Sequence, residues 1–432
     1  MFKLYNSKVA YQVFLRDFTA EGNISAFIKR LDYIKSLGVD AIQLLPINPI
    51  GKLGRKGTIG SPYSISDYES INPDFGSMKD FSLLVKEIHS RGLSLILDMV
   101  FNHCANDSVL LKSHPDFFLR DKKGNLIRKC KDWSDVTDLD HNNKELEDYL
   151  VKVLSFYVSL GVDGFRFDVA SLINPSFFKK AKQALKKQNK NICFIGEAVD
   201  TGFILYLREQ GYKAYSNEEL VSNGVDIVYH YASWHYLKQY LHSFDSKELE
   251  AYKAAFNVEA SSIEEKGSVM RAIENHDYPR INSYTSYPPL HDNLLAFSFF
   301  TRGPAFIYNG EECQDVVQPS LFEKETILFN KPTAAYATLF QALIKYKHEE
   351  KNNSLLVSTC LESSLGTLLI KNTFKNQSYQ FGLFNLTTKP IQFTSSCLID
   401  GKYQDYLTKE EITIKDHTLT LNEPLFMIPL SK

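Results

Sequence analysis

Long apolar runs, tryptophan and closely spaced cysteines are all scarce in this 432-residue chain. No stretch approaches the roughly 18 consecutive apolar residues of a transmembrane helix, so we expect no membrane span and no membrane partner. The first residues lack a long apolar run behind a basic start and lack a small-residue cleavage site, which predicts a cytoplasmic protein without a signal peptide. The 6 cysteines contain no C-x-x-C pair, so we interpret them as reduced packing residues rather than as a zinc site or a disulfide framework.

An excess of charge of one sign is also lacking. The chain has 49 Lys and Arg residues against 51 Asp and Glu residues, a formal net charge of -2. Nucleic-acid binding usually requires a basic excess or stripe, so we expect no nucleic-acid partner. Hydrophobic residues make up 44% of the chain and charged residues 23%, which is typical of a globular protein with a large core and excludes whole-chain disorder. Nothing in the composition indicates an oligomeric state.

Short β-rich apolar runs recur along the first three quarters of the chain, and helical patterns lie between them. The runs cover residues 9–15, 41–46, 93–100, 163–169, 191–197, 225–230, 269–276 and 304–310. Buried parallel strands have this near-continuous apolar character. Several helical patterns stop at a glycine, which is typical of a helix C-terminus (Gly38, Gly92 and Gly161). Eight strand–helix repeats predict an α/β fold, a (β/α)8 TIM barrel, whereas a doubly wound sheet would show a glycine-rich phosphate turn after its first strand.

Two regions depart from this repeat. Residues 104–143 carry turn residues and little periodicity, which predicts a small insertion domain after the third strand. After about residue 349, short strands alternate with turns and predict a C-terminal antiparallel β domain. We therefore expect a catalytic barrel at residues 1–103 and 144–348, an insertion domain at 104–143 and a β domain at 349–432.

Polar residues interrupt the ends of the predicted strands, where a barrel of this kind holds its chemistry. Three different strands deliver a carboxylate to this edge: Asp168, Glu197 and Asp277. Retaining cleavage of a glycosidic bond needs one ionised carboxylate as nucleophile and one protonated carboxylate as acid. Arg166 and Asp168 share one face of a strand, so the guanidinium would keep Asp168 ionised. Glu197 follows an apolar strand, where partial burial and nearby carboxylates would favour its protonated form.

Each of these signals also has an ordinary interpretation. An R-x-D pair is often a simple ion pair, a lone strand-end glutamate is often solvated, and N-H-D is a common turn composition. Their joint placement at the ends of different barrel strands favours a catalytic edge.

Four short motifs stand in order along the chain: DMVFNH, GFRFDVA, GEAV and ENHD, accompanied by GVDAIQLLP, SPYSISDYESINPDFG, DWSDVTDLD and GPAFIYNGEE. With these motifs the chain resembles the α-amylase family of glycoside hydrolases (glycoside hydrolase family 13) over nearly its full length. The resemblance implies that Asp168 is the nucleophile, Glu197 the general acid/base and Asp277 the transition-state stabiliser. It further implies sugar contacts by Tyr63 as a stacking platform and by His103, Arg166 and His276, with Asp98 pairing with Arg166. Arg280 lies where some members place a sugar-binding arginine.

The resemblance also raises the question of a metal. Asn102 matches a calcium ligand of such enzymes, and the insertion offers further acidic side chains (Asp132, Asp135, Asp138 and Asp140). The family's Lys-His pair after the nucleophile is replaced here by Ser171 and Leu172. Because no cluster has metal-ligand spacing, we predict no metal site and no required cofactor, with calcium left open.

The expected function is that of a retaining glycoside hydrolase that cleaves α-1,4-glucosidic bonds in maltooligosaccharides or starch-derived α-glucans by double displacement. The alternatives are an exo-acting α-glucosidase or an α-glucan transglycosylase, because water or a second sugar can resolve a covalent intermediate. A more remote alternative is a non-catalytic family member that acts as a binding or partner subunit; such members lack the carboxylates that this chain retains.

Overall fold

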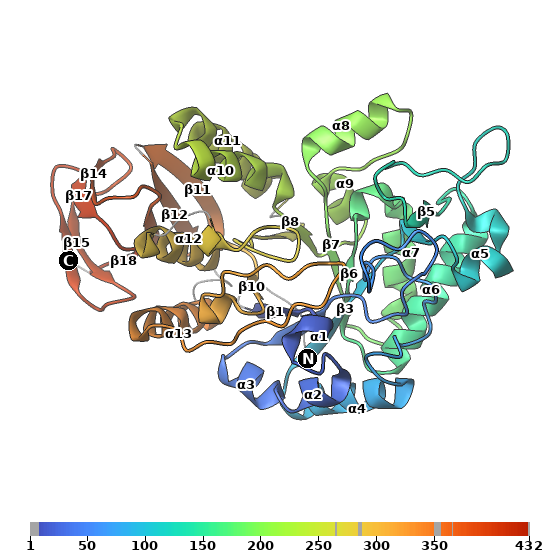
Figure 1. The fold of residues 1–432 in the computed structure, drawn as a ribbon. Helices are drawn as coiled ribbons and strands as arrows, with labels where there is room; N and C mark the ends of the chain where they lie inside the picture. The colour runs from blue at the N-terminus through green and yellow to red at the C-terminus, as the bar shows by residue number, and fades with distance from the viewer. Residues whose placement is uncertain (1–7, 264–265, 284–286, 350–355, 365, 431–432) are drawn as a thin grey trace. The chain divides into compact units, whose positions relative to one another are not determined.

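The computed structural model describes residues 8–263, 266–283, 287–349, 356–364 and 366–430, and its backbone is drawn in Figure 1. The chain forms two compact units. The first consists mainly of Ala10–Tyr229 with Val317–Leu328, and the second mainly of His230–Val316 and the chain from Phe329 onward.

The first unit is built on buried parallel strands. They are β1 (Val9–Val13), β2 (Ala41–Leu44), β3 (Ser94–Met99), β6 (Gly164–Phe167), β7 (Cys193–Gly196) and β8 (Ile227–Tyr229). Every residue of these strands is buried, as the continuous apolar runs predicted. The register between β3 and β6 sets Asp98 opposite Arg166, which brings two functional side chains together.

Helices alternate with these strands along the first unit (Figure 1). They are α1 (Leu15–Phe18), α2 (Ile24–Ile28), α3 (Leu31–Ser36), α4 (Met78–Ser90), α5 (Val109–Ser113), α6 (Lys144–Ser159), α7 (Pro175–Leu185), α8 (Thr201–Glu209) and α9 (Asn217–Ser222). Ser77 and Asp80 form a capping box at the start of α4. Gly92 and Gly161, with φ of 67° and 102°, follow the ends of α4 and α6 in the left-handed conformation that stops a helix.

Two local features refine the predicted pattern. The single helix expected around Phe27–Leu37 is divided into α2 and α3, because Arg30 N donates to Phe27 O and tightens the backbone between them. The insertion contains a two-stranded antiparallel pair, β4 (His103–Ala105) with β5 (Val136–Asp138), in which His103 lies opposite Asp138.

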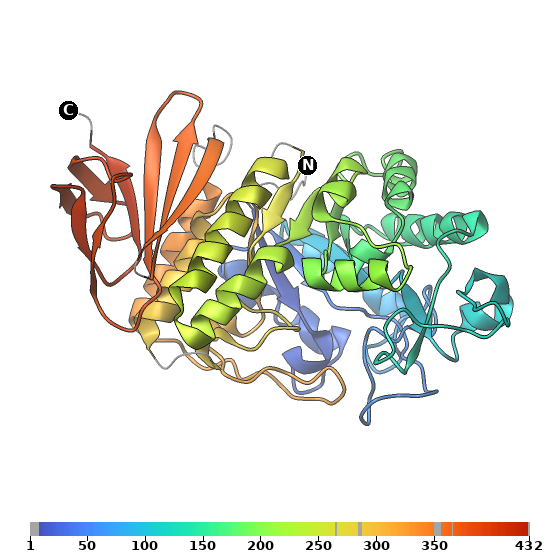
Figure 2. The same cartoon turned by 90° about the horizontal axis from the view of Figure 1, so that it is seen from above.

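The second unit combines helices with a C-terminal antiparallel sheet. Its helices are α10 (Tyr231–Ser243), α11 (Ser246–Ser262), α12 (Pro288–Phe300) and α13 (Ala334–His348), and its short strands are β9 (Ser268–Met270) and β10 (Ala305–Tyr308). Figure 2 shows α10 and α11 packed side by side, with α11 next to β11 (Leu356–Ser364). The predicted strand over 269–276 stops at Met270, so Glu274 to Asp277 lie in the loop beyond β9.

The C-terminal strands confirm the predicted β domain. One sheet has the order β11-β12-β13-β18-β15-β16, and β14 pairs with β17. After β11 the strands are β12 (Thr367–Phe374), β13 (Tyr379–Asn385), β14 (Ile391–Thr394), β15 (Gly401–Asp405), β16 (Glu411–Ile414), β17 (Thr418–Leu421) and β18 (Leu425–Pro429). Their core contains Phe381, Leu383, Tyr403 and Met427.

The parallel strands of the first unit pair in the order β1-β2-β3-β6-β7-β8. This order follows the chain, as successive strands of a (β/α)8 barrel do. The prediction of a TIM barrel with an insertion after the third barrel strand and a C-terminal β domain is confirmed. Within the described residues, no helix has the length and apolar character needed to cross a membrane.

Candidate active site

The buried guanidinium of Arg166 organises the carboxylates at the strand ends of the first unit. Its Nη1 donates to both oxygens of Asp98, each at 2.8 Å, and to Oδ1 of Asp168 at 3.1 Å. Its Nη2 lies 2.9 Å from Oε1 of Glu197. The side chain of Arg166 is fully buried, so these contacts act in a medium of low polarity. One cation therefore holds three carboxylates, which come from the ends of β3, β6 and β7.

Burial and the neighbouring charges shift the pKa values of this cluster in opposite directions. Burial raises the pKa of Asp98 to about 6, although the Arg166 guanidinium and the Tyr63 hydroxyl both act to lower it. Burial by itself would lower the pKa of Arg166, but the charges of Asp98 and Glu197 outweigh burial and hold this pKa above its ordinary value. Arg166 is therefore permanently charged, as the sequence interpretation required.

Glu197 also accepts a hydrogen bond from the turn directly after Asp168. Its Oε2 accepts a hydrogen bond of 2.7 Å from the backbone N–H of Val169. Val169 has a φ of 37°, a left-handed conformation that strains a β-branched residue. Glu197 is only 6% exposed, as expected from its place after an apolar strand. Sequence reasoning did not foresee its hydrogen bond from Val169.

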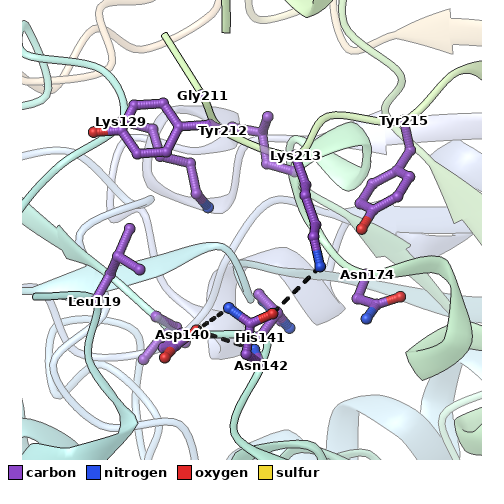
Figure 3. Close-up of a pocket in the computed structure, with 12 residues that line it drawn as sticks. Leu119, Lys129, Asp140, His141, Asn142, Asn174, Gly211, Tyr212, Lys213 and Tyr215 are labelled. Carbon is purple, nitrogen blue, oxygen red and sulfur yellow. Dashed lines mark hydrogen bonds between the residues drawn. The ribbon is translucent and has the colours of Figure 1, made fainter. Parts of the chain in front are cut away.

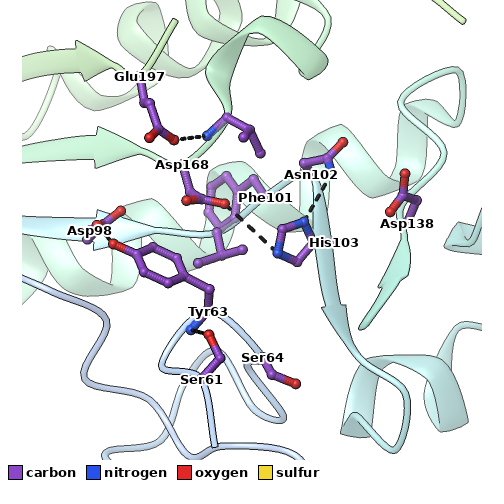
Figure 4. Close-up of polar contacts among 12 residues, drawn as sticks. Ser61, Tyr63, Ser64, Asp98, Phe101, Asn102, His103, Asp138, Asp168 and Glu197 are labelled. Carbon is purple, nitrogen blue, oxygen red and sulfur yellow. Dashed lines mark hydrogen bonds and ion pairs between the residues drawn. The ribbon is translucent and has the colours of Figure 1, made fainter. Parts of the chain in front are cut away.

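His103 lies at the start of β4 and faces Asp168 (Figure 4). The amide Nδ2 of Asn102 lies 3.0 Å from His103 Nδ1, so this ring nitrogen accepts and Nε2 carries the proton. Nε2 lies 3.9 Å from Oδ2 of Asp168. Burial lowers the pKa of His103 to about 3, so the ring is neutral near pH 7. The ring centroid of Trp133 lies 5.2 Å from that of His103.

Tyr63 lies beside the same cluster in the loop after β2. Its hydroxyl donates to Oδ2 of Asp98 at 3.0 Å, and its ring centroid lies 5.7 Å from the Arg166 guanidinium carbon. Figure 4 shows the Tyr63 ring on the side of Asp168 away from Glu197.

Sequence reasoning did not single out Tyr229, the last residue of β8. Its ring lies 5.6 Å from the Arg166 guanidinium carbon, and its hydroxyl accepts a hydrogen bond of 3.1 Å from Gln43. Its position at the C-terminal end of a barrel strand is the signal that could have identified it.

The remaining predicted residues lie in the second unit, in the loop after β9. Asp277 Oδ2 accepts a hydrogen bond of 3.1 Å from the Tyr231 hydroxyl and lies 3.3 Å from His276 Nε2. Asn275 donates to the Tyr231 hydroxyl at 2.7 Å and accepts from the backbone N–H of Asp277 at 2.8 Å. His276 is buried, and the side chain of Asp277 is 34% exposed. The N-H-D triplet is thus held in a defined turn with one carboxylate at its surface.

Arg280, for which the resemblance implied a sugar contact, is placed in contacts within the protein. Its guanidinium is fully buried, where Nη1 pairs with Glu274 at 2.7 Å and Nη2 donates to Asn309 O at 2.8 Å. The side chain is committed to contacts within the protein, so it is a poor candidate for a sugar-binding arginine.

The residues around Asn102 do not fit the calcium ion that the resemblance left open. Asn102 Oδ1, the oxygen a cation would need, accepts a hydrogen bond of 2.6 Å from the ammonium of Lys129. Of the insertion's aspartates, Asp138 pairs with Lys129 and Asp135 pairs with Lys56. Among the described residues, no group of three or more His, Cys, Asp or Glu side chains could hold a metal ion.

Comparison with known proteins defines the class to which this barrel belongs. The model of the α-amylase catalytic domain matches residues 12–353. The crystal structure of an α-amylase from Lactobacillus plantarum superimposes with a TM-score of 0.89 at 32% identity, covering 98% of both chains. That of a maltogenic α-amylase from Thermotoga neapolitana gives a TM-score of 0.83 at 26% identity, covering 99% of both.

Among curated proteins, α-amylase 3 of Dictyoglomus thermophilum is 26% identical over 344 residues, which cover 71% of this chain and 64% of that protein. The chain thus spans somewhat less than two thirds of this relative's length. The chain belongs to the α-amylase family of glycoside hydrolases, as its motifs predicted.

Proposed function

We propose that the protein is a retaining glycoside hydrolase that cleaves α-1,4-glucosidic bonds in maltooligosaccharides or starch-derived α-glucans. The observation that carries this proposal is the contact of one guanidinium, that of Arg166, with both Asp168 and Glu197. Carboxyl groups that share one guanidinium lie close together. Retaining enzymes need such a short separation, whereas inverting enzymes leave room for a water molecule between the carboxylates.

In the proposed mechanism, Asp168 attacks the anomeric carbon while Glu197 donates its proton to the leaving glycosidic oxygen. A covalent glycosyl–enzyme ester on Asp168 results. Glu197 then takes a proton from water, whose oxygen attacks the anomeric carbon and releases Asp168. Arg166 supports this cycle because it favours the ionised form of Asp168.

Three further side chains are proposed to bind the sugar at the cleavage point. Tyr63 offers an aromatic face beside Asp168, and the neutral His103 offers its Nε2–H as a donor to a sugar hydroxyl. His276 is proposed as a second imidazole donor.

Asp277 is proposed as the transition-state stabiliser. Its hydrogen bond from Tyr231 and its contact with His276 fix the orientation of the carboxylate, and its partial exposure leaves it accessible to a ligand. A fixed negative group favours the positive charge of an oxocarbenium-like transition state.

The names of relatives support an α-glucan substrate and leave the bond and mode of action as part of the proposal. They include an intracellular maltogenic amylase of Bacillus subtilis, 26% identical over 67% of this chain and 48% of that protein, and an oligo-1,6-glucosidase of Halalkalibacterium halodurans, 26% identical. We propose that the present protein acts in the cytoplasm, in line with the name of the intracellular Bacillus subtilis relative.

Product analysis on maltoheptaose tests the proposal directly. Internal cleavage to mixed maltooligosaccharides is expected from an α-1,4-specific endo-enzyme. Stepwise release of glucose would instead identify an exo-acting α-glucosidase, and products longer than maltoheptaose a transglycosylase. Cleavage of isomaltooligosaccharides but not of maltoheptaose would contradict the proposed bond specificity.

A further inference from the structure

Lys129 carries a buried ammonium group in the insertion of the first unit. Its neighbours in sequence include Arg128 and Lys131, yet its own side chain is only 9% exposed. The ammonium donates to Asn102 Oδ1 at 2.6 Å and lies 3.6 Å from Oδ2 of Asp138. Burying an ammonium costs free energy that only good partners offset, so these contacts define a built arrangement.

Backbone groups add two further hydrogen bonds around Lys129, Asp138 and Asn102. The N–H of Lys129 donates to Oδ2 of Asp138 at 3.0 Å, and Leu139 N donates to Asn102 O at 2.9 Å. Asp138 is fully buried on β5, directly opposite His103 on β4. Lys129 therefore connects the insertion to the residue that immediately precedes His103.

The contact with Lys129 determines which end of the Asn102 amide faces His103. An ammonium can only donate, so the amide oxygen must point to Lys129 and the amide nitrogen must point away. That nitrogen lies 3.0 Å from His103 Nδ1 and donates to it. A neutral imidazole that accepts at Nδ1 carries its proton on Nε2. Nε2 is the atom that lies 3.9 Å from Asp168.

We propose that Lys129 is a positioning residue of the active site, whose ammonium orients the Asn102 amide and thereby fixes His103 as the Nε2-protonated tautomer facing Asp168. The catalytic consequence rests on the proposed function. The orientation of the Asn102 amide and the tautomer of the His103 ring do not depend on the proposed function.

A cavity beside Lys129 makes chemical rescue possible. It has a volume of about 220 Å³ and its lining includes Lys129, His141 and Tyr212 together with the exposed residues Gly211 and Lys213 (Figure 3). A small cation that enters there can reach the place left by a truncated lysine side chain. Lys213 provides the control, since it lines the same cavity but its ammonium lies 3.5 Å from Asn142 instead of Asn102.

The test is a measurement of the ¹⁵N chemical shifts of His103 in the full-length protein and its variants. We expect the wild-type ring to be neutral and protonated at Nε2. In Lys129→Met the amide is free to rotate, so a mixture of the two neutral tautomers is expected. In the same variant we expect kcat/KM for maltoheptaose to fall about tenfold, mainly through a higher KM, because the His103 N–H no longer points consistently toward the sugar. Lys213→Met should leave both readouts unchanged.

Chemical rescue distinguishes a positioning role of Lys129 from a purely structural one. Adding ethylammonium to Lys129→Ala should restore the Nε2-protonated shift and most of the lost kcat/KM. Two results would overturn the proposal: a wild-type ring protonated at Nδ1, or an unchanged tautomer in folded Lys129→Met. The wild-type measurement decides even if the variants fail to fold. A failure of the proposed glycosidase activity would leave these spectra unaffected.

Discussion

Glu197 and Val169 are joined by a hydrogen bond of 2.7 Å from the backbone N–H to the carboxylate, so the proposed acid/base is tied to the peptide directly after the proposed nucleophile. Val169 holds a left-handed backbone conformation to make this bond. The strained turn thus links the two carboxylates through a short covalent and hydrogen-bonded path, an arrangement that favours the fixed geometry the proposed mechanism needs.

Replacing the proposed acid/base should stop turnover while sparing binding. For Glu197→Gln we expect kcat on maltooligosaccharides to fall by about 10²- to 10⁴-fold, because the amide cannot donate the proton that the leaving oxygen needs. Steady-state kinetics and calorimetric binding provide the two readouts. Glu209→Gln, at an exposed position on α8, is the matched control. Near-normal turnover by Glu197→Gln would contradict the assignment.

Removing the central guanidinium should destabilise the fold as well as the site. Arg166→Met leaves Asp98 buried without its cation, which should lower the free energy of unfolding by about 3–5 kcal/mol. Urea denaturation measures this change. Arg91→Met serves as the comparison, because Arg91 forms ion pairs near the surface with Asp32 and Glu87 and should cost about 1 kcal/mol or less. Equal losses in the two variants would refute the central role of Arg166.

The ring and the hydroxyl of Tyr63 should have separable effects. Tyr63→Phe retains the aromatic face and should change KM little, whereas Tyr63→Ala removes it and should raise KM about two- to tenfold. Kinetics on maltoheptaose distinguish the two variants. If both raise KM equally, the hydroxyl bond to Asp98 matters and the stacking role is wrong.

Acid should destabilise the protein partly through His230. Burial lowers the pKa of His230 to about 3, so the folded state keeps it neutral while the unfolded chain protonates it below about pH 6.5. Its contribution to stability is therefore present above pH 6.5 and is lost as the pH falls toward 3. His230→Phe should reduce the pH dependence of the unfolding free energy between pH 6.5 and 4.5. His235→Phe, at an exposed position, should leave that slope unchanged; an unchanged slope in His230→Phe would contradict the prediction.

Chelators should have no effect on the wild-type enzyme. The ammonium of Lys129 already donates to Asn102 Oδ1, the oxygen that a cation would bind. We expect the same melting temperature and activity after dialysis against EDTA as after addition of calcium. A melting temperature that falls with EDTA and recovers specifically with calcium would show that a structural metal site exists in this protein.

The fold was predictable because its signals are local. Each predicted barrel strand overlaps an observed strand, and Arg166 and Asp168 share a face because alternate residues of a strand must. The sequence pattern failed where burial depends on distant partners. The strand predicted over 269–276 ends at Met270, and nothing in the local sequence marks Lys129 as a buried lysine. Tyr229 was missed for a related reason, since its contacts with Arg166 and Gln43 arise only when the sheet forms.

The contacts of Arg166 also bear on which inhibitors this site should select. Asp98, Asp168 and Glu197 surround a single guanidinium, so two carboxyl groups remain to one cation even when Glu197 carries the proton of the proposed mechanism. Under the proposed mechanism the negative charge of this cluster lies close to the anomeric carbon, where positive charge develops, and the burial of Arg166 and Asp98 weakens screening by solvent. A sugar mimic with a protonated ring nitrogen would match this field before any bond is broken, whereas a neutral mimic of the same shape would not. The site should therefore discriminate between inhibitors by charge more strongly than by the pattern of their hydroxyl groups.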